Sequence, residues 1–352
     1  MTPVKWVYSF LEKYRYKMAA GLLMVTGIAL LTIVNPYISG RIVDDVITGG
    51  NYKLLPVLIG CLLGVVALKG ILRYASQVMF EICSQGVLYS MRDAVYRKLL
   101  QEDFSFYNKN RTGDLMSRQT GDMDAIRHFI AYIIYSVYEN ILLLSFALIM
   151  IFTVNVKLAL AMLVVLPFTA LTTYGQSKSV RPAFMKIRQQ FSSLNTFVQE
   201  NISGNRVVKA FAREDFEIEK FNKENDAYRD AELNAAAIWK KYVPIFEFLS
   251  NILTVVLMLY GGYMGIQGEI TMGNLVTVNG YLWMLTVPLR MAGWWINDIH
   301  RFTTSAEKIY TTYSQEPEIQ EPQQPIVRKH FHGDVEFKNV SYQAEDADII
   351  HD

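Results

Sequence analysis

Four ionisable side chains interrupt otherwise apolar stretches of the chain: Lys69, Glu139, Glu247 and Arg290. A charge inside an apolar segment is costly, and it is retained where it pairs, contacts water or binds a ligand. Two cations and two anions at similar depth could pair with one another, or reach an interface through their long side chains. They could also line a water-filled mouth that receives amphiphilic solutes. The choice between these interpretations depends on the elements that carry the four residues.

Six apolar stretches approach the ~20 residues that cross a ~30 Å hydrocarbon core. They cover about residues 18–38, 55–77, 130–153, 158–174, 244–266 and 275–296. The fourth is the shortest, and we expect Pro167 to bend it. Buried helices of a soluble protein are the alternative, which six such stretches in one chain disfavour. The sequence therefore predicts an all-α membrane protein with six spans.

Basic residues predict how these spans are oriented, because they concentrate on the cytoplasmic side of a membrane. The loop over residues 267–274 has none, whereas the connection between the fourth and fifth spans has many. Several also precede the first span: Lys5, Lys13, Arg15 and Lys17. We therefore expect the N-terminus and both long connections to be cytoplasmic.

A short amphipathic helix is predicted before the first span. Apolar residues recur there at helical spacing: Val4, Val7, Phe10, Leu11 and Tyr14. Lysines lie between them, which is typical of a helix at the cytoplasmic membrane interface. The alternative is that this segment is the frayed start of the first span.

Two long, charged helical segments separate the spans, and we call them the first arm (residues 81–128) and the second arm (residues 175–243). The second span is expected to continue as one helix to about Asp103, a rod of about 75 Å. A turn at residues 108–113 and a returning helix from Asp114 complete the first arm. The second arm is expected to break at residues 203–205, turn near residues 211–216 and return from Glu217.

The ends of both arms carry motifs that resemble ABC exporters of type IV, the multidrug and lipid exporters. FYNKNRTGDLMSR (residues 106–118), followed by Asp122 and Asp124, is similar to their first intracellular loop. QENISGNRVVKAFARE (residues 199–214) is similar to their second. The resemblance covers nearly the whole chain, and it implies the exporter transmembrane fold.

The resemblance also implies short coupling helices at about residues 105–111 and 211–216, which dock on nucleotide-binding domains. The second would reach the domain of a partner subunit. Aromatic residues suit a buried socket and charged residues suit its rim. The alternative is that the aromatic residues only close their own hairpin. The candidate coupling residues are Phe106, Tyr107, Arg111, Phe211, Arg213, Glu214 and Phe216.

The resemblance further implies that the sixth span lines the translocation pathway. Its candidate residues are Asn279, Trp283, Arg290 and Trp294, beside Lys69, Glu139 and Glu247 of other spans. An aromatic belt at the inner membrane interface is the alternative for Trp294. Two pairs of glycines, at positions 60 and 64 and at 261 and 265, permit close helix approach.

Residues 1–313 are expected to form the transmembrane domain, followed by a proline-spaced linker over 314–332. Residues 333–342 alternate like a strand and resemble the opening strand of an ABC nucleotide-binding domain, so 333–352 are expected to begin a truncated α/β domain. Tyr342 is a candidate nucleotide contact, although Ala344 stands where the family has its adenine-stacking aromatic residue. The sequence has no G-x-x-x-x-G-K-[S/T] loop, so ATP and Mg²⁺ would bind in the missing domain. Catalytic residues and a metal site are not predicted.

The resemblance implies half of an ATP-driven exporter, which moves an amphiphilic drug, lipid or peptide out of the cytoplasm by alternating access. Its expected partners are a second half-transporter, identical or not, nucleotide-binding domains and membrane lipids. A prokaryotic plasma (inner) membrane is the expected location. A net charge of +1 gives no footprint for nucleic acid. The alternative function is a non-transporting membrane receptor or regulatory channel on the same scaffold.

Overall fold

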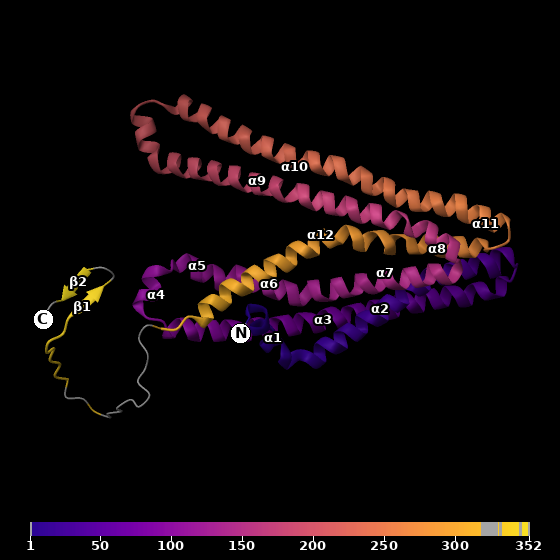
Figure 1. The fold of residues 1–352 in the computed structure, drawn as a ribbon, viewed down its shortest axis with the longest axis horizontal. Helices are drawn as coiled ribbons and strands as arrows, with labels where there is room; N and C mark the ends of the chain where they lie inside the picture. Colours follow the sequence, from indigo (N-terminus) through magenta and orange to yellow (C-terminus); the bar gives the residue numbers. More distant parts are fainter. Residues whose placement is uncertain (1, 318–329, 331–332, 345–346, 351–352) are drawn as a thin grey trace.

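The computed structural model describes residues 2–317, 330, 333–344 and 347–350. Nearly all of this chain is helical, and it forms two limbs that join at one end and diverge toward the other (Figure 1). One limb is the hairpin of α9 and α10, and the other is a bundle that contains α1 to α7. Helix α12 lies between them along part of its length.

The helices are α1 (Pro3–Leu11), α2 (Arg15–Arg41), α3 (Leu55–Gln101), α4 (Phe104–Lys109), α5 (Thr112–Ser117), α6 (Met123–His128), α7 (Ile134–Val154), α8 (Val156–Leu163), α9 (Val165–Ala210), α10 (Glu214–Val256), α11 (Gly262–Ile266) and α12 (Met272–Ser314). Short π-helical segments join several of them, at Ile42–Thr48, Arg118–Asp122, Phe129–Ile133 and Leu257–Gly261. Two strands, β1 (Tyr342–Ala344) and β2 (Ala347–Ile350), pair antiparallel near the C-terminus.

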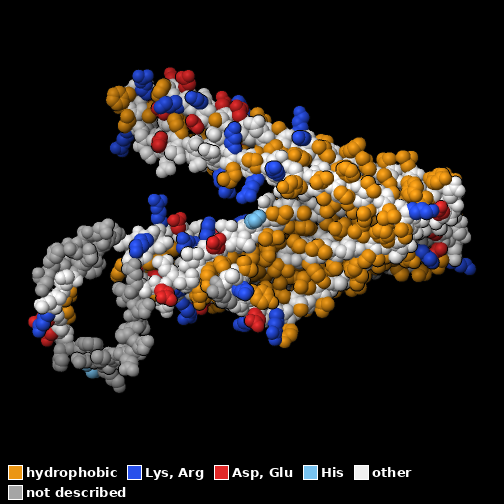
Figure 2. All heavy atoms as spheres, viewed as in Figure 1, with side chains coloured by type: hydrophobic (Ala, Val, Ile, Leu, Met, Phe, Trp, Pro, Cys, Tyr) orange, Lys and Arg blue, Asp and Glu red, His pale blue; other side chains and the backbone are white. Residues whose placement is uncertain are grey.

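Five helical stretches are long and apolar enough to cross a membrane: Pro3–Thr48, Tyr52–Gln101, Thr112–Val154, Val156–Ala210 and Glu214–Ile266. Figure 2 shows apolar side chains covering the surface where the limbs join, whereas charged side chains gather toward the divergent ends. The predicted sixth span lies in α12, which is not among the five. Polar residues such as Asn279 and Arg290 lower the mean hydropathy of this helix, so its crossing of the membrane stays a prediction.

The arms are formed by long continuous helices. The predicted extension of the second span is confirmed, since α3 has 47 residues and ends at Gln101. The predicted break at residues 203–205 is wrong, because α9 runs unbroken through them to Ala210. A glycine within a helix costs only about 1 kcal/mol, and the packing of α9 along α10 offsets that cost.

The two arms turn differently at their ends. Helix α4 confirms the predicted short helix of the first arm, and the Asp103 carboxylate caps it by accepting a bond of 3.0 Å from the Phe106 N–H. The predicted helix over residues 211–216 is wrong. Helix α9 ends at Ala210 and α10 begins at Glu214, and the turn between them places Ala212 at a φ of +49°. A left-handed residue stops helical hydrogen bonding, so the chain reverses within three residues.

The fourth predicted span is interrupted at Val164, between α8 and α9. Pro167 has no N–H to donate to the Leu163 carbonyl, so one helical hydrogen bond is missing at this point.

Helix α1 confirms the predicted helix before the first span, but part of its apolar face is covered by protein. Trp6 and Val7 are buried. The Trp6 ring lies 4.9 Å from the ring of Tyr313 and 5.9 Å from that of Tyr310, at the end of α12. The N-terminal helix therefore supports the C-terminal part of α12.

Helices α2 and α12 form a close seam near the joined end of the limbs. A Cβ atom on Gly280 would lie 2.6 Å from the Pro36 side chain, and one on Gly273 would overlap the Gly40 carbonyl oxygen. The hydroxyl of the buried Tyr281 donates a bond of 3.0 Å to the Ile33 carbonyl. The absence of side chains on these glycines lets the two backbones approach.

Polar contacts extend the same seam to the start of α12. The Asp44 carboxylate accepts a bond of 2.7 Å from the Gly273 N–H and one of 2.5 Å from the Thr271 hydroxyl. Thr271 in turn accepts from the Asn274 N–H at 3.1 Å and caps the helix. A carboxylate at a helix N-terminus is stabilised by the helix dipole, so this corner fixes where α12 begins.

The predicted strand over residues 333–342 is wrong. Residues 333–341 have no regular secondary structure, and a strand starts only at Tyr342. Val335 and Phe337, which belong to the alternating pattern, are exposed. A strand needs a neighbour for its backbone groups and a surface for its apolar face, and these residues have neither within the described chain. Most of the predicted linker, residues 318–329 and 331–332, lies outside the described residues.

The seam gives a direct test through its glycines. Gly273→Ala should lower the free energy of unfolding by about 2 kcal/mol, because the new methyl group would meet backbone and the Asp44 carboxylate, which cannot move aside cheaply. Gly60→Ala is the control, since no heavy atom lies within 4 Å of that position and alanine favours a helix. Thermal unfolding of the detergent-purified protein measures both. Equal tolerance of the two changes would contradict the close α2–α12 contact.

Candidate functional site

An ion pair joins α3 and α7 inside the predicted spans. The Arg73 guanidinium contacts both carboxylate oxygens of Glu139, at 2.6 Å and 2.5 Å. The Glu139 side chain is 9% exposed and that of Arg73 is 32% exposed. This two-pronged geometry is the strong form of an arginine–carboxylate contact, so Glu139 is neutralised by Arg73 and not by the other three charges considered from the sequence.

Arg73 was not among the site residues predicted from the sequence. The signal was present, because Arg73 lies within the predicted second span, one helical turn after Lys69. Lys69 is half-buried and lies near both Arg73 and Glu139. It forms no ion pair within the described part of the chain, so this cluster has an excess of positive charge.

The polar residues of α12 lie on one face. At 100° per residue, Asn279, Trp283, Arg290 and Trp294 fall within an arc of about 60°. All four are exposed, whereas Tyr281 is buried against α2. Glu247 of α10 is exposed too, and neither it nor Arg290 pairs with a charge among the described residues. The structure therefore brings Lys69 and Glu139 together, and it leaves Glu247 and the α12 face apart from them.

At the end of the first arm, the two predicted aromatic anchors differ in exposure. Phe106 is 2% exposed, and the Tyr107 hydroxyl donates a bond of 2.7 Å to the Leu99 carbonyl of its own hairpin. Phe104 is 88% exposed and was missed, although it lies two residues before the motif. Arg111 is exposed at the start of α5. Phe106 thus closes the hairpin, and Phe104 is free to contact another molecule.

At the end of the second arm, Phe211 is 74% exposed. Phe216 is partly covered by two cations, with Lys220 at 4.5 Å and Arg213 at 5.8 Å from its ring centroid. Glu214 accepts a bond of 2.8 Å from Lys209. This lysine, together with the Glu214 backbone, lowers the pKa of the Glu214 carboxyl from its ordinary value. The tip is therefore an exposed ring surrounded by fixed charges.

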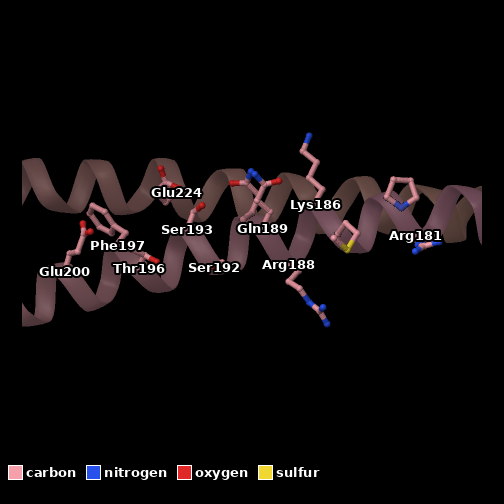
Figure 3. A pocket seen from close by; sticks show the side chains of 13 residues that line it. Arg181, Lys186, Arg188, Gln189, Ser192, Ser193, Thr196, Phe197, Glu200 and Glu224 are labelled. Atoms are coloured by element: carbon pink, nitrogen blue, oxygen red, sulfur yellow. The ribbon is translucent and has the colours of Figure 1, made fainter. Parts of the chain in front are cut away.

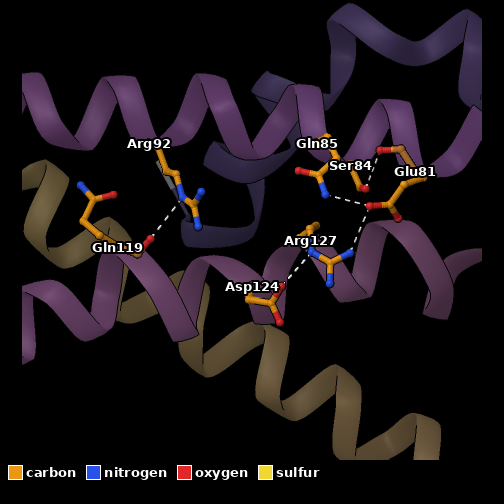
Figure 4. A network of polar contacts seen from close by, with 7 residues as sticks. All are labelled: Glu81, Ser84, Gln85, Arg92, Gln119, Asp124 and Arg127. Atoms are coloured by element: carbon orange, nitrogen blue, oxygen red, sulfur yellow. Dashed lines mark hydrogen bonds and ion pairs between the residues drawn. The ribbon is translucent and has the colours of Figure 1, made fainter.

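Polar contacts tie the two helices of the first arm together (Figure 4). Arg127 contacts Asp124 at 2.7 Å and Glu81 of α3 at 3.3 Å. Arg92 donates a bond of 3.2 Å to the Gln119 carbonyl. Exposed ion pairs are individually weak, but these cross-links lie along one side of a hairpin and resist its opening.

The same arm is attached to α12. The Ser305 hydroxyl donates a bond of 2.7 Å to Asp122, and Arg118 bonds to the Thr312 hydroxyl. Displacement of the arm therefore acts directly on the last turns of α12.

A groove runs along the second arm between α9 and α10 (Figure 3). Basic and polar side chains dominate its walls: Arg181, Lys186, Arg188, Gln189, Ser193 and Glu224. No group of three or more metal-ligating side chains occurs in the part of the chain that the structure describes.

Long helices that cross an apolar band and continue into charged arms define a multi-pass membrane protein. The family model for the ABC transporter transmembrane region matches residues 18–289. The chain belongs to this family.

Three relatives illustrate the similarity. The uncharacterized ABC transporter ATP-binding protein YknU of Bacillus subtilis is 36% identical over 332 residues, which are 93% of this chain and 56% of the relative. The ATP-dependent lipid A-core flippase of Syntrophus aciditrophicus is 25% identical over 336 residues, 96% of this chain and 56% of the relative. The multidrug resistance-like ATP-binding protein MdlA of Escherichia coli is 25% identical over 338 residues, which are 95% of this chain and 57% of the relative. The chain spans a little over half the length of each.

The ion pair within the membrane is testable by a double-mutant cycle. Arg73→Gln should lower the free energy of unfolding by about 3 kcal/mol, because the buried Glu139 carboxylate loses both contacts with the guanidinium. Arg73→Gln together with Glu139→Gln should recover much of this loss, since both charges are removed. Thermal unfolding of the four proteins in detergent measures the coupling. Simple addition of the two single effects would show that the pair does not stabilise the α3–α7 contact.

Proposed function

We propose that the chain is the membrane-spanning half of an ATP-driven exporter, which moves an amphiphilic substrate out of the cytoplasm by alternating access. The observation that carries the proposal is the pair of arms, whose helices leave the apolar band without a break and end in exposed aromatic rings, Phe104 and Phe211. A rigid helix transmits displacement along its length. Family membership, and the names of two relatives, a lipid A-core flippase and a multidrug resistance-like protein, support the same conclusion.

The arm ends would dock on nucleotide-binding domains, which would bind ATP with Mg²⁺. Aromatic anchors rimmed by charge, such as Phe211 beside Arg213 and Glu214, suit such a socket. ATP binds the closed arrangement of two such domains more tightly and so shifts the population toward it. The intact protein would therefore be an ATP-dependent translocase. Tyr342, at the start of β1, remains a candidate nucleotide contact.

Two half-transporters, identical or different, would enclose the pathway. Helix α12 would supply the sixth span, and its exposed face with Asn279, Trp283, Arg290 and Trp294 would face that pathway. The basic residues of both arms favour a cytoplasmic location for the arms and for the N-terminus. Bacterial relatives favour the plasma (inner) membrane of a prokaryote, where membrane lipids surround the apolar band.

The coupling role is tested in the full-length protein, reconstituted in liposomes. Phe211→Ala should reduce ATP-driven dye transport about thirtyfold, because an anchor at the centre of an interface is worth about 2 kcal/mol. Its unfolding midpoint should stay unchanged, since the ring is exposed. Phe106→Ala is the contrasting variant, and it should lower the free energy of unfolding by about 3 kcal/mol, because the ring is buried in the hairpin.

Undiminished transport by the Phe211→Ala protein would contradict the proposal that the arms transmit movement from nucleotide-binding domains to the spans. ATP hydrolysis without any directional accumulation of dye would favour the receptor or channel instead.

A further inference from the structure

Lys69 lies deep in the predicted second span. The span is expected to end near residue 77, so the Lys69 Cα lies about 12 Å from the cytoplasmic edge of the apolar core. Side chains lean toward the N-terminus of their helix, which for α3 is the outer end in the proposed orientation. The Lys69 ammonium is therefore directed away from the nearer interface, and cytoplasmic lipid head groups are out of its easy reach.

The surroundings of Lys69 leave its charge uncompensated. Glu139 is the carboxylate near it, and the Arg73 guanidinium already binds both oxygens of that carboxylate. No other carboxylate pairs with Lys69 in the described part of the chain. Desolvation disfavours the charged form of a lysine, so an anion from outside the chain would stabilise the Lys69 ammonium.

An aromatic cluster lies on the cytoplasmic side of the ion pair. The Phe80 ring lies 5.2 Å from that of Tyr135, and Tyr132 contacts both Tyr135 and His128 at 5.5 Å. On the same face of α3 as Lys69, Leu72 lies against Gly27 of α2. Lys69 thus lies beside an apolar contact between α2 and α3, and the aromatic cluster lies further toward the cytoplasmic end of α3, as a site for the apolar part of an amphiphile requires.

We propose that Lys69 binds the acidic head group of an amphiphilic substrate, a carboxylate or a phosphate. Glu139 is already paired with Arg73, so the Lys69 ammonium is the charge available to the head group. The proposal rests on the proposed function, because it names the chemical class of the exported substrate. It assigns Lys69 as the residue that selects acidic over neutral amphiphiles.

Equilibrium binding to the full-length protein, in discs of neutral phosphatidylcholine and without ATP, tests the assignment. The probes are a fluorescent dodecanoic acid and its methyl ester, which differ only in the charge of the head group. The unmodified protein should bind the acid about tenfold more tightly than the ester, the factor expected for one charge-assisted contact. Lys69→Gln should remove this preference, and Lys69→Arg should keep it.

Lys157→Gln is the matched control, because it deletes the same charge at an exposed ion pair with Glu269. It should leave the affinity for the acid within about twofold of the original, since the factor of ten comes from a contact at Lys69. Equal affinity of acid and ester, or an unchanged preference in Lys69→Gln, would overturn the proposal. Displacement of the acid by phosphatidylglycerol added to the discs would overturn the substrate assignment in favour of a structural lipid. Displacement by inorganic phosphate would support an anion site.

The readout needs neither ATP nor arm movement. A failure here would therefore leave the coupling proposal standing, and a failure of coupling would leave this binding result unaffected.

Discussion

Hydrocarbon cannot hydrogen-bond to a peptide group, and this constraint shapes the whole molecule. Every backbone N–H and C=O within a membrane must find a partner in its own helix. The chain meets this requirement with long helices, and α3 and α9 extend for 47 and 46 residues. A rod stiff enough to cross the membrane is also stiff enough to act as a lever beyond it. The arms therefore follow from the spans.

Charge is placed differently inside and outside the apolar band. Inside it, Arg73 and Glu139 form a two-pronged pair that cancels both charges and joins α3 to α7. Outside it, Arg127 of α6 joins the two helices of the first arm through Glu81 of α3, and Asp124 of its own helix holds the same guanidinium. The first arm is thus held together at two levels and attached to α12. The hairpin of α9 and α10 packs mainly on itself and diverges from the bundle, so relative motion is expected between the limbs.

Where the sequence predicted an element correctly, a local cause was sufficient. Apolar length identified the five stretches that can cross a membrane, and the family motif at residues 106–118 implied the short helix α4. The predictions failed where the structure of a segment depended on another segment packed beside it. The glycine at 204 did not break α9, because α10 lies along it. Residues 333–341 did not form a strand, because an alternating pattern pairs only if another strand is beside it.

The sequence by itself determined the apolar stretches, the two arms and the motifs at their ends, because hydrophobic length and helical period are properties of a continuous segment. Only the tertiary structure decided which residues meet. It paired Glu139 with Arg73, turned Phe106 inward while Phe211 stayed outside, and used Gly273, not Gly60, for close helix approach. Each of these outcomes depends on which face of one helix is turned toward another. The points at which two helices cross are set by the packing of segments far apart in the sequence, so a local sequence pattern does not predict them.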